Sequence, residues 1–250
     1  MTVTILRGHV QTRPTSHVAT DQAALTAFLE IHATPNPRIL DCSWNHGKMW
    51  RGLPWQPHRF DIDPALALDL DTVGDFLHLD TYFPGQSFDV IVFDPPHVTE
   101  AGRTGVMGGG YYADSYGSRS AVAVGASITP LFAPFLAGAA VILAPGGVVL
   151  AKIANQVHRG RQQWQADDFK AAAVEAGFTR CDEIVKTRRT AITGNWATIR
   201  HVRKVHSYWL CVRLGKDCHR RHASPAGVPE SPLRPQKPRP RQTKGQEWYK

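Results

Sequence analysis

The sequence predicts an α/β fold with a doubly wound, mostly parallel sheet, for three reasons. Segments with strand periodicity alternate with segments of helical periodicity along most of the chain. The run Phe88–Phe93, FDVIVF, is almost entirely apolar, as in strands that are buried on both faces of a parallel sheet. The chain has 250 residues, of which 42% are hydrophobic, so it can bury one substantial core. One α/β domain is therefore expected, with ligands bound at the carboxyl ends of the strands.

Helices are predicted where apolar residues recur every three to four positions. The first, Asp21–Ile31, places Ala24, Leu25, Phe28, Leu29 and Ile31 on roughly one face. The others are a short helix from Gly47 onward, Ser120–Ala140, which Pro130 and Pro134 must bend or divide, and Ala166–Ala176, which Gly177 closes.

Strands are predicted at short runs rich in apolar and β-branched residues. In chain order they are Arg38–Asp41, His58–Ile62, Phe88–Phe93, Gly147–Ile153, Cys181–Val185 and Ser207–Arg213. The last two are expected to close the sheet, and no internal repeat is visible.

The composition favours a cytoplasmic protein without a metal. The first residues, MTVTILRGHVQTRP, lack the apolar segment of a secretion signal. Prolines and paired glycines break the apolar stretch 121–150, so no membrane span is expected. The four cysteines form no CxxC pair, so reduced thiols are expected. Cys218, His219 and His222 match no standard zinc spacing, so no metal is expected.

Positive charge is concentrated in the carboxyl-terminal part of the chain. The net charge is +8, and residues 215–250 carry nine Lys and Arg against three acids, a net of +6. This segment is rich in proline and poor in apolar residues, which predicts a disordered basic tail after a folded domain of residues 1–214. Such a tail attracts phosphate without regard to sequence.

A turn with acids on both sides forms the first candidate site. The segment ILDCSWNHGK is predicted as strand, tight turn and helix, with Asp41 at the strand end. Gly47 supplies a positive φ and allows close approach of a ligand, and Asn45 tolerates the same conformation. Asp61 ends the next strand and is placed to accept hydrogen bonds from a ribose diol.

Two ligand classes compete for this turn. A nicotinamide dehydrogenase is disfavoured because the full GxGxxG pattern is missing. S-adenosylmethionine has no phosphate to cradle, so one glycine among several acids suits it better. Asp75, near the expected end of a third strand, is then placed to bind the adenine amino group, and Phe76 to pack on the ring.

The sharpest motif is the tetrapeptide Asp94-Pro95-Pro96-His97 directly after FDVIVF. An exocyclic amine is a poor nucleophile, because its lone pair is delocalised into the ring. A carboxylate at the strand end and the carbonyl of the first proline supply two acceptors for its N–H groups. The two prolines fix φ, so little reorganisation remains for the transition state. His97 is placed to stack on a base drawn out of its helix.

These motifs resemble the class I S-adenosylmethionine-dependent methyltransferases, specifically the N6-adenine/N4-cytosine DNA methylase group. The matching segments are ILDCSWNHG, FDID, GDF, FDVIVFDPPH, LAPGGVVLAKIANQ and RHVRKVHSYWLCVR. They span about residues 21–214. The resemblance implies a Rossmann-like, seven-stranded, mostly parallel sheet with an antiparallel last strand. Two positions depart from the family pattern: Asn45 stands where glycine is usual, and His97 replaces an aromatic residue.

Two regions are candidates for contact with nucleic acid. The glycine-rich segment 98–117 carries Tyr111 and Tyr112, which suit a loop that closes on a flipped base; an ordinary surface loop is the alternative. From Lys186 to Lys216 there are eight Lys and Arg and no acid, which favours a phosphate-tracking surface. The expected nucleic-acid contacts are Tyr111, Tyr112, Lys152, Arg188, Arg189, Arg200, Arg203 and Lys204.

The leading hypothesis is therefore methyl transfer to N6 of adenine in DNA, with N4 of cytosine as runner-up. RNA is an alternative substrate, and an inactive nucleic-acid-binding module is an alternative of another class. Methylation at C5 of cytosine is disfavoured, because it needs a nucleophilic cysteine and the chain has no Pro-Cys dipeptide.

Overall fold

The computed structural model describes residues 16–85, 87–95, 127–158, 161–187 and 206–215. All of them fall within one structural unit, residues 1–220. The predicted tail, 215–250, lies outside the described residues except for Gly215.

An eight-stranded sheet runs through the middle of this unit, in the order β1-β9-β10-β6-β5-β2-β3-β4. Strand β10 is antiparallel to both of its neighbours, and the other pairs are parallel. The strands are β1 (His17–Val18), β2 (Ile39–Asp41), β3 (His58–Asp61), β4 (Thr72–Val73), β5 (Phe88–Phe93), β6 (Leu143–Ile153), β9 (Phe178–Thr187) and β10 (His206–Leu214). Because β3 and β4 lie on one side of β2 and β5 lies on the other, the order reverses between β2 and β5, where α/β sheets bind ligands.

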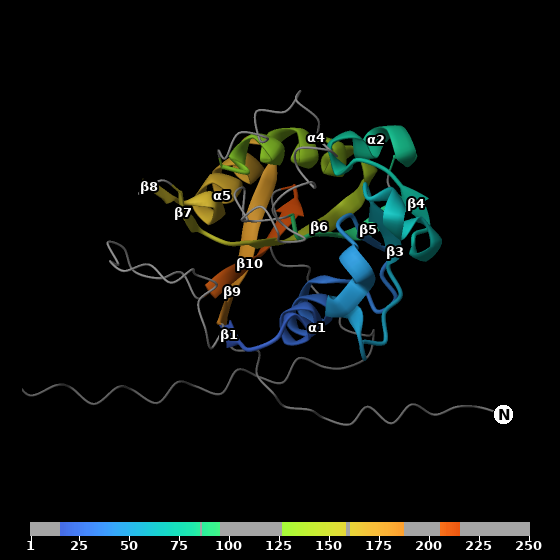
Figure 1. Ribbon diagram of the computed structural model, residues 1–250, viewed down its shortest axis with the longest axis horizontal. Coiled ribbons are helices and arrows are strands. Elements are labelled where there is room, and N and C mark those ends of the chain that lie inside the picture. The colour runs from blue at the N-terminus through green and yellow to red at the C-terminus, as the bar shows by residue number, and fades with distance from the viewer. Residues whose placement is uncertain (1–15, 86, 96–126, 159–160, 188–205, 216–250) are drawn as a thin grey trace, which may run out of the picture. The chain divides into compact units, whose positions relative to one another are not determined.

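Helices cover both faces of the sheet (Figure 1). On one face, α1 (Asp21–His32) and the 3₁₀ segment η1 (Asn45–Trp50) pack with Val90, Val92 and Trp209. On the other face lie α2 (Leu79–Tyr82), α4 (Phe132–Ile142) and α5 (Gln165–Glu175). The remaining short elements are η2 (Pro64–Asp69), η3 (Phe76–His78), η6 (Thr129–Leu131) and a hairpin of β7 (Gln156–His158) and β8 (Arg161–Gln163).

Aromatic rings fill the core under α4. The rings of Phe93 and Phe135 stack with centroids 3.8 Å apart, and Phe76 contacts both rings edge-on. All three side chains are almost fully buried. This packing fixes the carboxyl end of β5 and therefore the position of the residue that follows it, Asp94.

The α/β architecture and the antiparallel last strand are confirmed, with three differences from the sequence expectation. The sheet has an eighth strand, β1, whose two residues are too few to show a periodicity. The hairpin β7–β8 was not predicted. The described part of the expected helix 120–140 becomes helical only at Thr129, with Pro130 in η6 and Pro134 in the first turn of α4, where proline costs no helical hydrogen bond.

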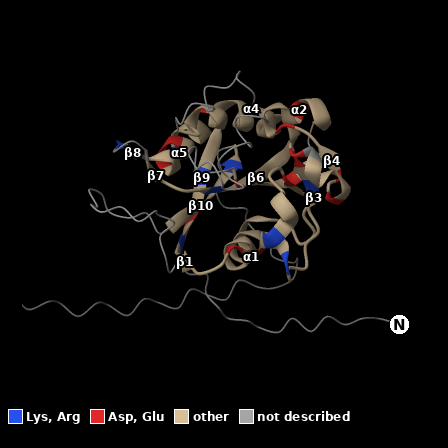
Figure 2. Ribbon diagram, viewed as in Figure 1, with Lys and Arg blue, Asp and Glu red and all other residues tan. Residues whose placement is uncertain are grey.

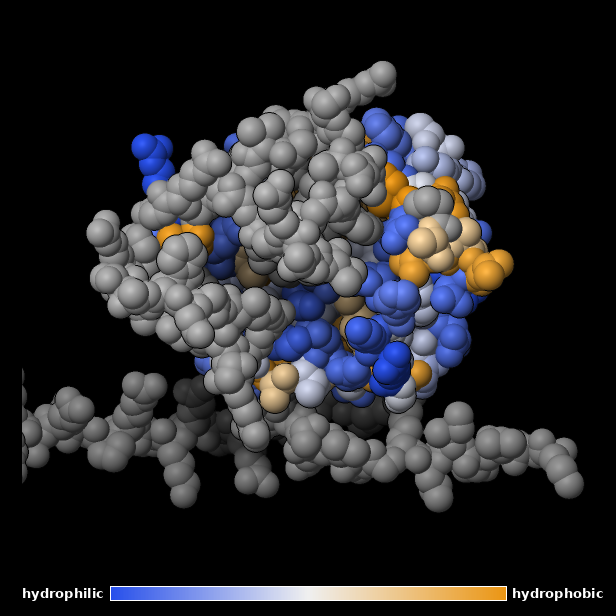
Figure 3. Space-filling view, viewed as in Figure 1, coloured by the Kyte–Doolittle hydropathy of each residue, from blue (hydrophilic) through white to orange (hydrophobic). Residues whose placement is uncertain are grey.

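On the face seen in Figure 3, most of the described surface is hydrophilic, and apolar side chains gather near β3 and β4. Leu68, Val73 and Tyr82 are among the exposed ones there. Within the described ranges, no helix has both the length and the apolar character needed to cross a membrane.

Candidate active site

The two motif segments meet where the strand order reverses. Strands β2 and β5 pair in parallel with Asp41 opposite Val92, and the backbone N–H of Cys42 donates to the carbonyl of Val92 at 3.1 Å. One residue further on, the hydroxyl of Ser43 accepts the backbone N–H of Asp94 at 2.7 Å. The turn after β2 and the start of the tetrapeptide after β5 are therefore in direct contact.

The turn after β2 has three consecutive residues with positive φ. Asn45, His46 and Gly47 have φ of 34°, 63° and 57°. The positive φ predicted at Asn45 and Gly47 is confirmed, and that of His46 was not anticipated. The space beside the α-carbon of Gly47 is filled by the indole ring of Trp44, with which an added Cβ would overlap. The absence of a side chain at this position thus makes room for Trp44.

Substituting Gly47 with alanine is expected to destabilise the protein more than substituting Gly52. Both glycines have positive φ, but an added Cβ meets nothing within 4 Å at Gly52, whereas at Gly47 it displaces Trp44. The strain at φ > 0 costs about 1 kcal/mol in both variants, and the overlap adds about 1–3 kcal/mol at Gly47 alone. Chemical denaturation measures both losses. Equal losses would contradict the packing described for Trp44.

Asp61 closes the turn from the neighbouring strand. Its side chain is 2% exposed, and its two oxygens accept the backbone N–H groups of Asn45 at 3.0 Å and Asp63 at 3.1 Å. These two bonds orient the carboxylate of Asp61. The aspartate predicted to bind a ribose is thus held beside the turn.

The residues predicted to hold an adenine ring lie just past β4. Asp75 is half-buried and caps η3 by accepting the backbone N–H of Leu77 at 2.9 Å. Phe76 is 4% exposed and packs against Phe93 and Phe135. Most of the Phe76 ring is therefore used in the core, and only a small part of it is left for a ligand.

Asp41, at the end of β2, is completely buried. One of its oxygens accepts the indole N–H of Trp50 at 2.6 Å, and the other accepts the backbone N–H of Ser43 at 3.1 Å. The pKa of Asp41 is raised to about 7, mainly by burial and in smaller part by the negative charges of Asp94 and Asp61, although the two hydrogen bonds lower it. Three carboxyl groups are therefore close enough to repel one another.

A lysine on the next strand, β6, neutralises Asp94. The ammonium of Lys152 lies 2.8 Å from the Asp94 carboxylate and 3.4 Å from that of Asp21, the first residue of α1. Burial alone would lower the pKa of Lys152, but the two carboxylates outweigh it and raise the pKa.

Figure 2 shows acidic residues around β3 and β4, and Lys and Arg among β6, β9 and β10.

Lys152 was predicted to contact nucleic acid, and the structure gives its ammonium two carboxylate partners within the protein. Lys152 is 7% exposed, and its ammonium is shared between two carboxylates, so it does not lie on a phosphate-tracking surface. The basic run from Lys186 to Lys216 is corrected in the same way at two positions. Arg213 is 3% exposed and donates to the backbone carbonyls of His32 and Gly146, and Lys186 pairs with Asp21.

Amide side chains lie just beyond β6. The side-chain oxygen of Asn155 accepts the backbone N–H of Ala166 at 3.0 Å and ties the end of β6 to the start of α5. Gln165 is completely buried, and neither atom of its amide has a hydrogen-bond partner in the described part of the chain. A buried amide without a partner costs free energy.

Several predicted site residues lie outside the described ranges. They are Pro96, His97, Tyr111, Tyr112, Arg188, Arg189, Arg200, Arg203 and Lys204.

Four residues of the site were missed by sequence reasoning: Asp21, Ser43, Trp44 and Trp50. Ser43 and Trp44 lie inside the recognised turn, so their polar and aromatic side chains were a usable signal. Asp21 had none, because a helix-initiating aspartate ordinarily needs no partner beyond its own helix.

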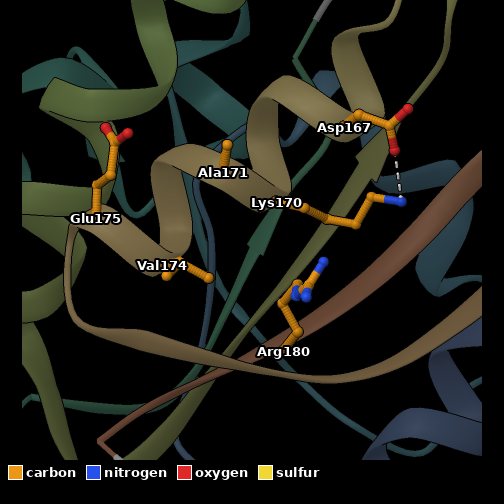
Figure 4. A pocket seen from close by; sticks show the side chains of 6 residues that line it. All are labelled: Asp167, Lys170, Ala171, Val174, Glu175 and Arg180. Carbon is orange, nitrogen blue, oxygen red and sulfur yellow. Dashed lines mark ion pairs between the residues drawn. The ribbon is translucent and has the colours of Figure 1, made fainter.

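A surface hollow of about 360 Å³ lies away from these residues, between α5 and β9. It is lined by Asp167, Lys170, Ala171, Val174, Glu175 and Arg180 (Figure 4). The ammonium of Lys170 pairs there with Asp167 at 2.8 Å. None of the residues predicted for the active site lines this hollow.

No family model and no curated protein matches the sequence. Among solved structures, the chain is similar to a protein of Thermus thermophilus, complexed with S-adenosyl-L-methionine, to which DNA modification methylase activity is ascribed. The identity is 18% over 64% of this chain and 56% of that chain, with a TM-score of 0.38. It is also similar to the cytosine-N4-specific PvuII DNA methyltransferase, at 15% identity over 56% and 47% of the chains, with a TM-score of 0.40.

A third similar structure is the 1,6-didemethyltoxoflavin-N1-methyltransferase of Burkholderia thailandensis, with bound S-adenosylhomocysteine. The identity is 12% over 78% of this chain and 77% of that chain, with a TM-score of 0.48. The chain spans about half the length of each of the first two proteins. At these identities and TM-scores the likenesses assign no substrate, and the fold follows from the strand order itself.

Proposed function

We propose that this chain is an S-adenosylmethionine-dependent methyltransferase that acts on an exocyclic amino group of a nucleic-acid base, N6 of adenine or N4 of cytosine in DNA. The observation that carries the proposal is the hydrogen bond between the Ser43 hydroxyl and the backbone N–H of Asp94. It joins the turn proposed for the cofactor to the backbone of Asp94, the residue whose carboxylate is proposed to hold the target amine. Methyl transfer requires the cofactor and the target amine to be held next to each other, so the segments that bind them must also be in contact.

The charge of the site supports a cationic ligand. Asp41 and Asp61 end β2 and β3, and Asp94 follows the neighbouring strand β5. Repulsion from Asp61 and Asp94 helps to raise the pKa of Asp41 to about 7. A cation bound among them relieves this repulsion, whereas a phosphate adds to it. S-adenosylmethionine, when bound, supplies a methyl group on a positively charged sulfur, and the new nitrogen–carbon bond forms as the carbon–sulfur bond breaks.

The part played by the chain is to hold the target amine. The carboxylate of Asp94 accepts one N–H and favours a more tetrahedral nitrogen, with its lone pair directed at the methyl group. Lys152 compensates the charge of Asp94 on one side. The surplus proton of the methylated amine leaves to solvent, so no residue has to act as a strong base.

The amide of Gln165, which is buried and has no hydrogen-bond partner among the described residues, supports a base as substrate. An amide pairs with the donor and acceptor edge of a base, as in other nucleic-acid interfaces. The bases of RNA offer the same hydrogen-bonding edges, so RNA is compared with DNA as a substrate.

Two measurements test the proposal together. Calorimetry should detect S-adenosylmethionine binding, and the labelled methyl group should be transferred to DNA in preference to RNA. Transfer to RNA alone would move the substrate from DNA to RNA. Nucleic-acid binding without cofactor binding would instead indicate an inactive binding module.

Truncation after Leu214 is expected to weaken nucleic-acid binding and to flatten its dependence on salt, while cofactor affinity stays unchanged. Residues 215–250 carry a net charge of +6, and each lysine or arginine that neutralises a phosphate adds about 0.9 to the slope of log affinity against log salt concentration. Titrations at several salt concentrations measure this slope. Equal slopes for the full and truncated chains would exclude a role for the tail.

A further inference from the structure

Lys152 occupies an unusual position for a lysine. It follows Ala151, which is paired with Phe93 of β5, so it lies beside Asp94 across the two strands. The residue is 7% exposed, and its ammonium contacts the carboxylates of Asp94 and Asp21 at 2.8 and 3.4 Å. A lysine is rarely buried unless carboxylates compensate its charge, and here both lie within reach.

Asp21 is itself held from three sides. As the first residue of α1 it follows the capping residue Thr20, whose hydroxyl accepts the backbone N–H of Ala23. One oxygen of Asp21 accepts from Lys152 and from Lys186 of β9, and the other accepts the indole N–H of Trp209 of β10 at 3.0 Å. Helix α1 and strands β9 and β10 therefore fix the carboxylate that holds Lys152.

The four charged groups balance one another. Asp94 and Asp21 contribute two negative charges, and Lys152 and Lys186 contribute two positive charges. Removing one member of such a buried network leaves a charge without a partner. Only Asp94 belongs to the predicted catalytic motif. Asp21 and Lys186 lie outside it and are connected to Asp94 through Lys152.

We propose that Lys152 is a positioning residue, which fixes the Asp94 carboxylate for the target amine and is itself anchored by Asp21. The inference rests on the proposed function. The ammonium holds one carboxylate oxygen in place and favours the ionised form of Asp94, which accepts hydrogen bonds, over the protonated form, which donates one. Lys152 therefore acts on the reaction through Asp94 and needs no contact with substrate.

The experiment compares Lys152→Met with Lys152→Arg and with a matched control, Lys170→Met. Lys170 also pairs with two carboxylates, those of Asp167 and Glu183, but it lies on α5 beside the surface hollow of Figure 4. Steady-state methyl transfer is measured from pH 5 to 9 with each variant, and S-adenosylmethionine affinity is measured by calorimetry.

Lys152→Met is expected to lower kcat by up to about 100-fold, with little change in KM, because a misplaced reacting group costs about that much. The acid limb of its pH profile should move to higher pH, since Asp94 loses the cation that favours its ionised form. Lys152→Arg should restore the acid limb and part of kcat. Asp21→Asn should change both in the same direction but less, and Lys170→Met should change neither.

An unchanged kcat and acid limb in Lys152→Met would overturn the inference while wild-type activity leaves the proposed function standing. A wild-type protein that transfers no methyl group to any nucleic acid would overturn both. If Lys152→Met does not fold, Lys152→Arg and Asp21→Asn are compared with wild type in its place. A wild-type pH profile for Asp21→Asn would overturn the anchoring role of Asp21.

Discussion

Replacing Asp94 with alanine is expected to reduce methyl transfer by at least about 100-fold, the usual cost of removing one preorganised hydrogen-bonding group from a transition state. Affinity for S-adenosylmethionine should change little, because the turn from Asp41 to Gly47 and the carboxylate of Asp61 stay in place. The backbone N–H of Asp94 that binds Ser43 is also present in alanine. Single-turnover rates and calorimetry measure the two effects separately.

Asp89 provides the control for this substitution. It lies on β5, the strand that Asp94 follows, and its side chain is 20% exposed against 18% for Asp94, but it pairs with Arg38 near the opposite end of the strand. Asp89→Ala should therefore keep wild-type activity. Asp94→Asn should lie between wild type and Asp94→Ala, because an amide retains one acceptor oxygen but loses the ion pair with Lys152. Equal activity of Asp94→Ala and wild type would remove the proposed catalytic group.

The second large effect is a pH-dependent stability that originates at Asp41. Burial raises its pKa from 3.8 to about 7 in the folded state. Between these values the folded protein holds a proton that the unfolded chain has lost, so stability falls as pH rises through this window and levels off above about 7. Relative to Asp41→Asn, wild type should lose about 3 kcal/mol of stability between pH 4.5 and 8.

Asp71 provides an internal control of opposite sign. Its pKa is lowered to about 2, mainly by the hydrogen bond from Arg59, so its contribution is present at neutral pH and is lost as pH falls towards 2. The side chain of Asp71 is about one-third exposed, and screening by solvent keeps its contribution to stability small. Urea denaturation of wild type, Asp41→Asn and Asp71→Asn from about pH 2 to pH 8 measures both trends, because the window of Asp71 lies below its unfolded pKa of 3.8 and that of Asp41 lies above it. A constant difference between wild type and Asp41→Asn would show that Asp41 is ionised throughout.

The parts of the fold and site that could be predicted from the sequence depend on local patterns. The apolar run Phe88–Phe93 predicts a buried strand by itself, and an aspartate at a strand end is visible without knowledge of its neighbours. Because parallel strands place their carboxyl ends at one edge, Asp41, Asp61 and Asp94 were expected together. Their order along the sheet bears this out.

The parts that could not be predicted depend on contacts between distant residues. The alternation of side chains along a strand predicts on which face of β6 Lys152 lies. It does not predict the contacts of Lys152 with Asp94 and Asp21, which are 58 and 131 positions away in the sequence. Charge counting assigned Arg213 to a surface, whereas it satisfies backbone carbonyls inside the protein. The positive φ that favours glycine at position 47 could be read from the turn, but the packing of Trp44 beside its α-carbon could not.

The most direct test of the central claim is nucleoside mass spectrometry of DNA and RNA from cells that express wild type or Asp94→Ala. The proposed site predicts N6-methyladenine or N4-methylcytosine with wild type and none above background with the variant. A methyl group found only on carbon or ribose, or equal methylation by both proteins, would contradict the claim that Asp94 holds an exocyclic amine.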